Sequence, residues 1–464
     1  MLFSSIPFLY YFLPLVLIAY FVAPKKLKNS VLFVSSLVFY AWGEPVYVFL
    51  MAASITFAWA FGLLMEKAKT QKAKKIFMII SVIISFSFLA YFKYADFFIS
   101  NFNAATGLSV PLLKIALPVG ISFYTFQIAS YTIDIYRGDA KAKRNTIDFG
   151  TYVVLFPQLI AGPIVRYVDI AEQLENRTHT IEKTAYGIQR FCIGLGKKVL
   201  FANAFGELCS IFRESNEKTV LFYWMYAAAF MLQIYFDFSG YSDMAIGLGR
   251  IFGFTFLENF DFPYISKSIT EFWRRWHMSL GTWFRDYVYI PLGGNRVSKI
   301  KWFRNIFVVW FLTGFWHGAA WNFIVWGLYF AVLLVLEKLW LKKLLDKSKV
   351  FSHIYVMLLV VISFVIFNAT DMGEAIRYIG GMFGFGNVPS YSAEWLYYLR
   401  SYAVVIVMAI IGATPLPKKI AAKFSEKNEK LFNVAEPLVL VGLLIVMTAY
   451  LVDGSFNPFL YFRF

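Results

Sequence analysis

Residues 76–97 read IFMIISVIISFSFLAYFKYADF, a run that is apolar almost throughout and follows the basic segment EKAKTQKAKK at residues 66–75. At a rise of about 1.5 Å per residue, a helix over this run is long enough to cross the ~30 Å hydrocarbon core of a bilayer. Apolar runs of this kind recur along the whole chain. We therefore predict an all-α polytopic membrane protein with on the order of ten or more crossings.

Short basic clusters separate the apolar runs and predict the topology. Cytoplasmic loops carry an excess of Lys and Arg, so we place every cluster on the cytoplasmic side, which leaves both termini outside. The first segment, Met1–Val22, has no basic start and is predicted to be an uncleaved span. The clusters begin at Lys25, Glu66, Arg137, Lys299, Lys342 and Lys418.

Composition excludes several other classes of protein. The chain has 464 residues, of which 59% are hydrophobic and 16% charged, whereas a soluble domain carries about 25% charged residues. The net charge of +16 is spread over the clusters rather than gathered in one patch, so we expect no nucleic-acid partner. Cys192 and Cys209 form no CxxC pair and predict no disulfide framework.

Two central segments do not fit a straight lipid-facing helix. Residues 149–167 are apolar but contain Pro157, Gly162 and Pro163, and a broken backbone at membrane depth survives only inside protein or beside a wet cavity. Residues 266–291 alternate aromatic and charged side chains, which is typical of a cytoplasmic surface helix or a re-entrant element. We find no repeat and no soluble segment, so we expect one integral membrane domain over residues 1–464.

Two of the four histidines lie in informative surroundings. His317 lies in the apolar tract FLTGFWHGAAWNF, past mid-membrane if the cluster at Lys299 is cytoplasmic. His277 precedes that cluster and is expected nearer the cytoplasm. Polar sites at two depths suggest a passage with one reactant entering from each face, although a buried histidine can also serve only as a hydrogen-bonding partner between helices.

The chemistry available to a buried histidine is proton transfer near neutral pH. The sequence contains no HExxH, GxSxG or Walker A pattern and no Cys/His cluster, so we expect no metal site. A histidine without a nucleophilic partner fits direct transfer, in which it deprotonates a hydroxyl that attacks an activated acyl group.

Five ordered segments of the chain carry distinctive motifs. They are FYTFQIASYTIDIYRG (Phe123–Gly138), LFPQLIAGPIVRY (Leu155–Tyr167), YFDFSGYSDMAIGLG (Tyr235–Gly249), FWRRWHMSLGTWFRDYVYIPLGGNR (Phe272–Arg296) and TGFWHGAAWNFIVWG (Thr313–Gly327). Together they resemble the membrane-bound O-acyltransferase family, and in particular its bacterial alginate O-acetyltransferase branch. The resemblance runs from about Trp42 to the C-terminal NPFLYFRF. The last piece of the fourth segment, PLGGNR, favours the polysaccharide branch over the D-alanyl transferases of teichoic acid synthesis.

The resemblance implies a ring of roughly 11–13 transmembrane or re-entrant helices around a central passage. It places the catalytic histidine of the family on His317 and a second conserved polar position on His277. The chain departs from the family at Asn368, where an Arg is common, and we assign that position no role. The sequence environment suggests that positive neighbours disfavour protonation of His277, which would leave it a neutral hydrogen-bond donor.

The expected reaction takes an acyl group from a cytoplasmic thioester, with acetyl-coenzyme A the leading candidate and no resident cofactor. His317 acts as the base, and His277, Asn322 or an indole N–H such as that of Trp316 contacts the oxyanion. Arg274 and Arg275, with Lys301, either hold donor phosphates or anchor the chain to anionic lipid. The resemblance implies a bacterial cell membrane, a glycan acceptor and an extracytoplasmic partner protein.

The sequence leaves three alternatives open. They are a teichoic acid-type D-alanyl transferase, a polysaccharide or lipid transporter, and a nonenzymatic subunit of a cell-wall complex. Transporters commonly consist of two matching halves, which the sequence lacks. Asp237, Ser239 and Asp243 either line a passage or form an internal hydrogen-bonded network, and the network is the interpretation we favour.

Overall fold

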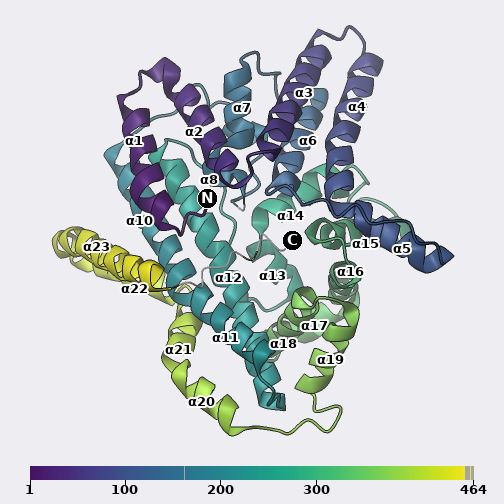
Figure 1. Cartoon of the computed structure of the whole chain (residues 1–464), viewed down its shortest axis with the longest axis vertical. Coiled ribbons are helices and arrows are strands. Elements are labelled where there is room, and N and C mark those ends of the chain that lie inside the picture. Colours follow the sequence, from purple (N-terminus) through teal and green to yellow (C-terminus); the bar gives the residue numbers. More distant parts are fainter. Residues whose placement is uncertain (161, 455–459, 461–464) are drawn as a thin grey trace. The chain divides into compact units, whose positions relative to one another are not determined.

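The computed structural model describes residues 1–160, 162–454 and 460, and all regular structure in these residues is helical (Figure 1). The chain divides into two compact units, which are described separately. Unit 1 comprises Met1–Phe191 and Ser242–Leu257, and unit 2 comprises Cys192–Tyr241 and Glu258–Phe464. The division falls within two helices, α10 (Ile181–Gly196) and α12 (Val220–Ile251). The expectation of one domain stays a prediction.

Unit 1 is built around the antiparallel pair of α3 and α4, against which α6 packs. The Thr70 hydroxyl accepts a hydrogen bond from the backbone N–H of Ala73 and caps the start of α4. The further helices of this unit are short. The helices that lie wholly in unit 1 are α1 (Leu13–Val22), α2 (Lys28–Gly43), α3 (Tyr47–Lys67), α4 (Gln71–Leu89), α5 (Ala95–Thr106), α6 (Ile121–Arg137), α7 (Thr146–Val154), α8 (Phe156–Leu159) and α9 (Tyr167–Ile170).

Unit 2 centres on the tightly packed hairpin of α15 and α16, and α18 packs on α16.

In the described chain, five short π-helical turns interrupt the helices, two in unit 1 and three in unit 2. They are Phe8–Phe12, Ala90–Tyr94, Lys197–Ala202, Arg285–Tyr289 and Glu337–Leu341. The α-helices of unit 2 are α11 (Asn203–Glu214), α13 (Ile269–Arg275), α14 (Met278–Phe284), α15 (Lys299–His317), α16 (Trp321–Leu336), α17 (Lys342–Leu345), α18 (Lys349–Asn368), α19 (Met372–Met382), α20 (Ala393–Ser401), α21 (Ala403–Gly412), α22 (Leu416–Lys427) and α23 (Glu429–Asp453).

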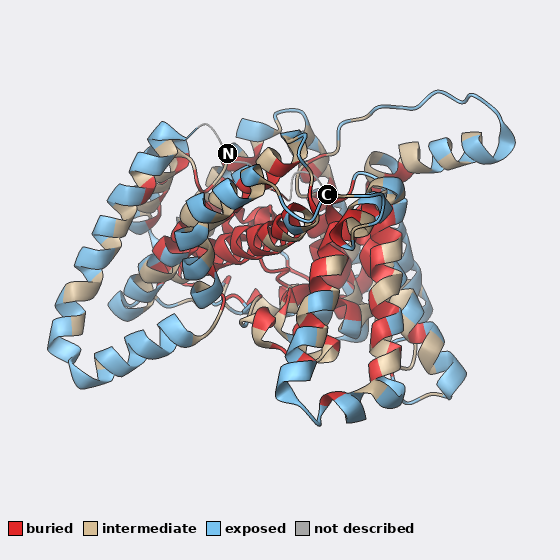
Figure 2. Cartoon of the chain, turned by 90° about the horizontal axis from the view of Figure 1, so that it is seen from below, coloured by how far each residue is buried: buried red, intermediate tan, exposed pale blue. Residues whose placement is uncertain are grey.

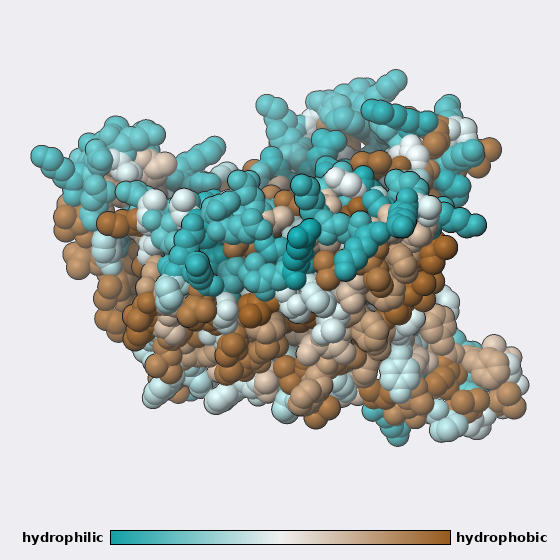
Figure 3. Space-filling view, turned by 90° about the horizontal axis from the view of Figure 1, so that it is seen from above, coloured by the Kyte–Doolittle hydropathy of each residue, from teal (hydrophilic) through white to brown (hydrophobic). Residues whose placement is uncertain are grey.

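Six helical segments of the described chain are long and apolar enough to cross a membrane, and the bent pair α20–α21 makes a seventh. The prediction of a polytopic all-α membrane protein is therefore confirmed. Other runs that the sequence interpretation counted as crossings form shorter helices, such as α2 and α6. The α23 helix is almost entirely exposed, as Figure 2 shows in pale blue at the left, and hydrophobic residues cover much of the face in Figure 3.

The break predicted within residues 149–167 is present. The α7 helix ends at Val154, and Pro157 lies in the first turn of the four-residue α8. Side chains satisfy the freed backbone groups: the Ser36 hydroxyl accepts from the N–H of Phe156, and Gln158 donates to the carbonyl of Tyr152. Because these residues are buried, broken backbone is tolerated here, as expected for irregular structure enclosed in protein.

Candidate active site

The α15–α16 hairpin places His317 at the last residue of α15. The two helices approach closely at Gly314 and Gly327. A methyl group at Gly314 would overlap the carbonyl oxygen of Phe323, and one at Gly327 would overlap that of Trp310. Small residues at both positions are therefore required for the contact that fixes the end of α15.

His317 is buried in an aromatic enclosure. Its imidazole lies edge-on to Trp326, with 5.1 Å between ring centroids, and edge-on to Phe367 at 5.2 Å. Its own chain neighbour Trp316 contributes a third ring at 5.0 Å. Rigid aromatic walls on several sides restrict the orientation of the imidazole, which a general base requires.

His277 comes from a different element and approaches the same tryptophan. It lies between α13 and α14 in the left-handed backbone region, with φ +45°, which is uncommon for residues other than glycine. Its ring centroid is 4.6 Å from that of Phe238 and 6.3 Å from that of Trp316. Trp316 thus contacts both histidines, so the structure brings the two predicted site residues together.

The hydrogen bonds of His277 determine which ring nitrogen carries the proton. Its Nδ1 lies 3.1 Å from Oδ1 of Asn259. The same oxygen accepts from the backbone N–H of Ser279 at 3.3 Å and from its hydroxyl at 2.9 Å, which identifies this atom of the amide as the oxygen. His277 therefore donates from Nδ1–H, and its Nε2 carries a lone pair.

The Nε2 atom of His277 is buried and has no hydrogen-bond partner among the described residues. Burial lowers the pKa of this imidazole to about 3, so the ring is neutral at physiological pH. Desolvation of the ring lowers this pKa, and not the positively charged neighbours that were expected from the sequence to do so. With Nδ1–H committed to Asn259, neutral His277 presents a hydrogen-bond acceptor, and not a donor, at Nε2.

A cavity of about 240 Å³ adjoins His277, between the α13–α14 segment and α15. Its walls are mostly apolar and include Trp273, Phe284 and Trp310, with Arg285 as the charged lining residue. The indole N–H of Trp273 is buried and without a partner in the described chain. An apolar cavity with a few polar groups is the usual form of a small-molecule site.

The arginines singled out from the sequence lie elsewhere. Arg274 is exposed, and Arg275 forms ion pairs with Asp261 at 2.7 Å and Glu271 at 3.1 Å. Lys301 is also exposed, and none of these three residues lines the cavity. Arg285, which lies within the fourth quoted segment, was not singled out from the sequence, because spacing alone does not indicate which arginine lines the cavity.

Two asparagines join the ends of helices near His317. Asn322 donates from Nδ2 to the carbonyls of Ala369 at 2.9 Å and Ile366 at 3.3 Å. Its amide hydrogens are therefore engaged, which leaves Oδ1 as its free atom within the described structure. Asn368 contacts the hydroxyl of Tyr226 at 2.8 Å. Both amides serve as links between helices in this arrangement.

The acidic residues of the third quoted segment form ion pairs. In unit 2, Asp237 lies 2.6 Å from Lys198 and accepts from the backbone N–H of Leu460. In unit 1, Asp243 lies 2.7 Å from Arg190. These ion pairs correspond to the internal network that we favoured for Asp237 and Asp243, whereas the buried hydroxyl of Ser239 has no partner in the described chain. Leu460 is the described residue of the quoted terminus NPFLYFRF; the others lie outside the described structure.

Comparison with known proteins identifies the family of the chain. The model of the membrane-bound O-acyltransferase family matches residues 12–376. The chain is 39% identical to a probable alginate O-acetylase of Azotobacter vinelandii over the full length of both proteins. It is 32% identical to a peptidoglycan O-acetyltransferase of Helicobacter pylori, over 84% of this chain and 81% of the relative.

A more distant relative is the teichoic acid D-alanyltransferase of Bacillus subtilis, which is 33% identical over 47% of this chain and 58% of its own length. The family match extends over most of the chain and includes both histidines, the cavity and the α15–α16 hairpin. The protein is therefore a multi-pass membrane enzyme that belongs to the membrane-bound O-acyltransferase family.

Proposed function

We propose that this enzyme transfers an acetyl group from cytoplasmic acetyl-coenzyme A to a hydroxyl of an extracytoplasmic polysaccharide, directly or through a partner protein. The alginate and peptidoglycan acetyltransferases among its relatives support an acetyl group and a glycan acceptor. They also support a location in a bacterial inner membrane. The D-alanyl transferase relatives match less than half of the chain, so we favour acetyl transfer.

The observation that carries the proposal is the pair of buried histidines on Trp316, with His277 lining the cavity. In the proposed reaction His317 removes the proton from the acceptor hydroxyl as its oxygen attacks the thioester carbonyl. The new C–O bond forms as the C–S bond breaks, and the thiolate leaves.

The polar groups around the two histidines have distinct proposed roles. His277 accepts a hydrogen bond at Nε2 and so orients the bound reactant, which replaces the donor role expected from the sequence. The indole N–H of Trp326 is buried, unpartnered within the described residues and adjacent to His317. We assign it to the developing oxyanion, since a preorganised donor in a dry site stabilises that charge strongly.

The cation at the cavity suggests how the donor is held. Arg285 lines the cavity, and its exposed side chain forms an ion pair with Asp286, with 2.7 Å between Nε and Oδ1. A guanidinium in this position suits the phosphates of the donor, while the thioester arm occupies the apolar interior. Arg274 and Arg275 remain candidates for contacts with lipid or with more distant parts of the donor.

The test uses purified full-length protein, acetyl-coenzyme A labelled in the acetyl group, and candidate glycans with and without extracytoplasmic proteins. Appearance of label on a glycan or on a partner hydroxyl supports the proposal. Label that stays on coenzyme A with every acceptor, while D-alanyl carrier protein acts as donor, would support the D-alanyl transferase alternative instead.

A further inference from the structure

A second charged site lies in unit 1 and uses none of the residues of the proposed reaction. It consists of four basic residues near the end of α1, three of which contact Tyr20, while the charge of the fourth acts on His179. Lys28 begins α2, Arg177 and His179 lie on the segment that leads into α10, and Lys183 lies in the first turn of α10. The four residues, here called the basic cluster, are Lys28, Arg177, His179 and Lys183.

Hydrogen bonds hold the centre of the basic cluster in place. The Tyr20 hydroxyl donates to the carbonyl of Phe252 at 2.8 Å and accepts from Nε of Arg177 at 2.7 Å. Nε2 of His179 lies 2.9 Å from the same hydroxyl. Because the only hydroxyl hydrogen is directed at Phe252, His179 must donate from Nε2. Two basic side chains therefore converge on one oxygen.

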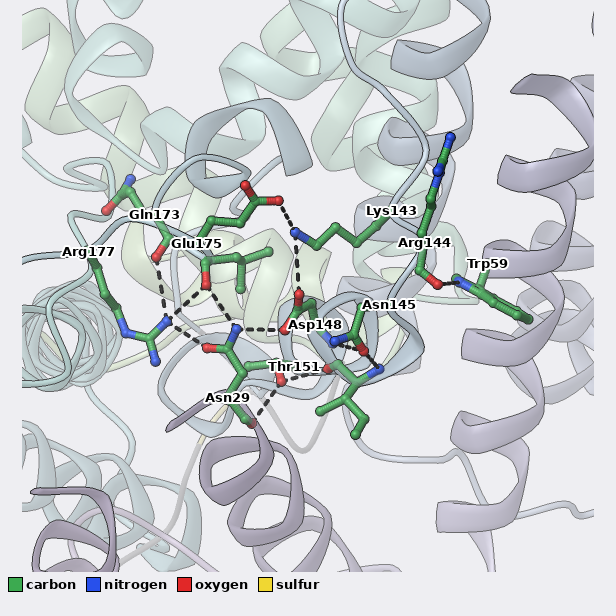
Figure 4. A network of polar contacts seen from close by, with 12 residues as sticks. Asn29, Trp59, Lys143, Arg144, Asn145, Asp148, Thr151, Gln173, Glu175 and Arg177 are labelled. Carbon is green, nitrogen blue, oxygen red and sulfur yellow. Dashed lines mark hydrogen bonds and ion pairs between the residues drawn. The ribbon is translucent and has the colours of Figure 1, made fainter. Parts of the chain in front are cut away.

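The guanidinium of Arg177 is fixed but not fully satisfied. One terminal nitrogen donates to Oδ1 of Asn29 at 2.6 Å, as Figure 4 shows. The other terminal nitrogen, Nη2, is buried and has no partner in the described part of the chain. The guanidinium also lies 4.7 Å from the ring centroid of Phe254. A buried guanidinium nitrogen without an acceptor is uncommon in proteins, so Nη2 is available to an anionic ligand.

No carboxylate forms an ion pair with the basic cluster among the residues that the structure describes. Two acids of the neighbouring network, Asp148 and Glu175, form ion pairs with Lys143 instead (Figure 4). Burial and the neighbouring charge of Arg177 lower the pKa of Lys28. Burial, followed by Lys28, Arg177 and Lys183, lowers the pKa of His179. The cations therefore repel one another, and an anion among them would relieve this repulsion.

The surroundings of the basic cluster point to lipid as the source of that anion. Phe21 and Val22 at the end of the apolar α1 are 46% and 80% exposed, and Ile181 next to the cluster is 85% exposed. The Phe21 ring contacts both His179 and Lys28. Cations beside exposed apolar side chains match a phospholipid, whose phosphate and acyl chains are adjacent.

A structural role explains only part of the arrangement. The C-terminal end of α12 attracts positive charge, and Tyr20 caps it through the carbonyl of Phe252. This role accounts for Tyr20 and for Nε of Arg177. It does not account for Lys28, whose ammonium lies over the rings of Tyr20 and Phe21, nor for Nη2 of Arg177, which has no partner in the described chain. Lys183 donates to the neutral Thr178 hydroxyl at 2.6 Å, which does not balance its charge.

We propose that the basic cluster binds the phosphate of an anionic phospholipid, with the acyl chains along Phe21 and Val22. The same chemistry would accept a phosphate of the coenzyme A donor, and the experiment distinguishes the two sources. The proposal does not depend on the identity of the acceptor or of the acyl group.

The test compares the wild-type protein with the double variant K28Q/K183Q, which removes two charges but keeps the hydrogen bonds that join Tyr20 to Arg177, His179 and Phe252. The matched control is K72Q/K74Q, because Lys72 and Lys74 belong to another basic segment of unit 1. Full-length detergent-solubilised protein is titrated with phosphatidylglycerol or phosphatidylcholine, and bound lipid is counted by native mass spectrometry. Monodispersity of each variant is checked first.

We expect phosphatidylglycerol to bind more tightly than phosphatidylcholine and K28Q/K183Q to lose about 30-fold in affinity, since each lysine near anionic lipid contributes about a factor of five. The control should bind as the wild type does. Phosphatidylglycerol should also raise the NMR-measured pKa of His179 in the wild type but not in K28Q/K183Q. Equal affinity in K28Q/K183Q and the wild type, or equal loss in the control, would overturn the proposal. Displacement of the lipid by micromolar adenosine 3′,5′-bisphosphate would overturn the lipid assignment in favour of the donor.

Discussion

The hydrogen bond between His277 and Asn259 gives a prediction that can be worked out in detail. The substitution Asn259→Asp keeps the shape of the side chain and its bonds to Ser279. It places a carboxylate 3.1 Å from Nδ1 of the imidazole. An opposite charge at that distance favours the protonated ring and raises its pKa by about 1–3 units.

The size of the effect on protonation follows from the pKa of the wild-type His277 ring. Burial holds the pKa of His277 at about 3, so a shift of that size moves it to about 4–6 in the variant. The variant ring is neutral at pH values well above its raised pKa, and it gains a proton as the pH falls through that pKa. The lone pair at Nε2 is then lost. At pH 5 the wild-type ring stays about 99% neutral, whereas the variant ring is between about one tenth and nine tenths protonated.

The assay is the pH dependence of kcat/KM for labelled acetyl transfer between pH 5 and pH 8. We expect Asn259→Asp to resemble the wild type at pH 8 and to lose up to about tenfold at pH 5 relative to it. Ser279→Ala is the control, because it removes one bond to the same oxygen without adding charge. A pH profile of Asn259→Asp that superimposes on the wild type, in folded protein, would refute the role given to Nε2. So would ¹⁵N NMR evidence for a proton on Nε2 of wild-type His277 at pH 7.

Three further predictions concern the cavity, the oxyanion and the hairpin. Arg285→Gln should raise KM for the thioester about tenfold with little change in kcat, whereas Arg274→Gln should leave both constants within about twofold; the opposite pattern would return the donor role to Arg274. Trp326→Phe should lower kcat by about 10- to 100-fold at unchanged KM if its N–H contacts the oxyanion, and full activity would exclude that role. Gly314→Ala should destabilise the fold by roughly 1–3 kcal/mol, because the methyl group meets the backbone carbonyl of Phe323; a thermal midpoint equal to that of the wild type would show that the hairpin can relax.

The general fold could be predicted from local patterns because membrane crossing depends on local composition. The run after residue 75 forms α4, and the prolines and glycine within residues 149–167 mark a real break. The two histidines could be identified because polar residues in apolar tracts are costly and therefore informative. These inferences need no knowledge of which segments touch.

The details of the site depend on contacts between distant segments and could not be predicted in this way. Asn259 fixes the tautomer of His277 from 18 residues earlier in the chain, and no pattern in the sequence links them. The same limit applies to Arg285, which lines the cavity while Arg274 and Arg275 of the same quoted segment do not. Asn322 was one of three groups expected to contact the oxyanion, but its amide hydrogens bind backbone carbonyls at the end of α18.

The most direct test of the reaction proposed here is the turnover of His317→Ala measured beside that of His277→Ala, each in protein shown to be monodisperse. Loss of a general base commonly costs about 10² to 10⁴ in rate. We therefore predict that folded His317→Ala retains less than about a hundredth of wild-type turnover and that His277→Ala is impaired by a smaller factor. If folded His317→Ala keeps more than about a tenth of wild-type turnover, His317 is not the base.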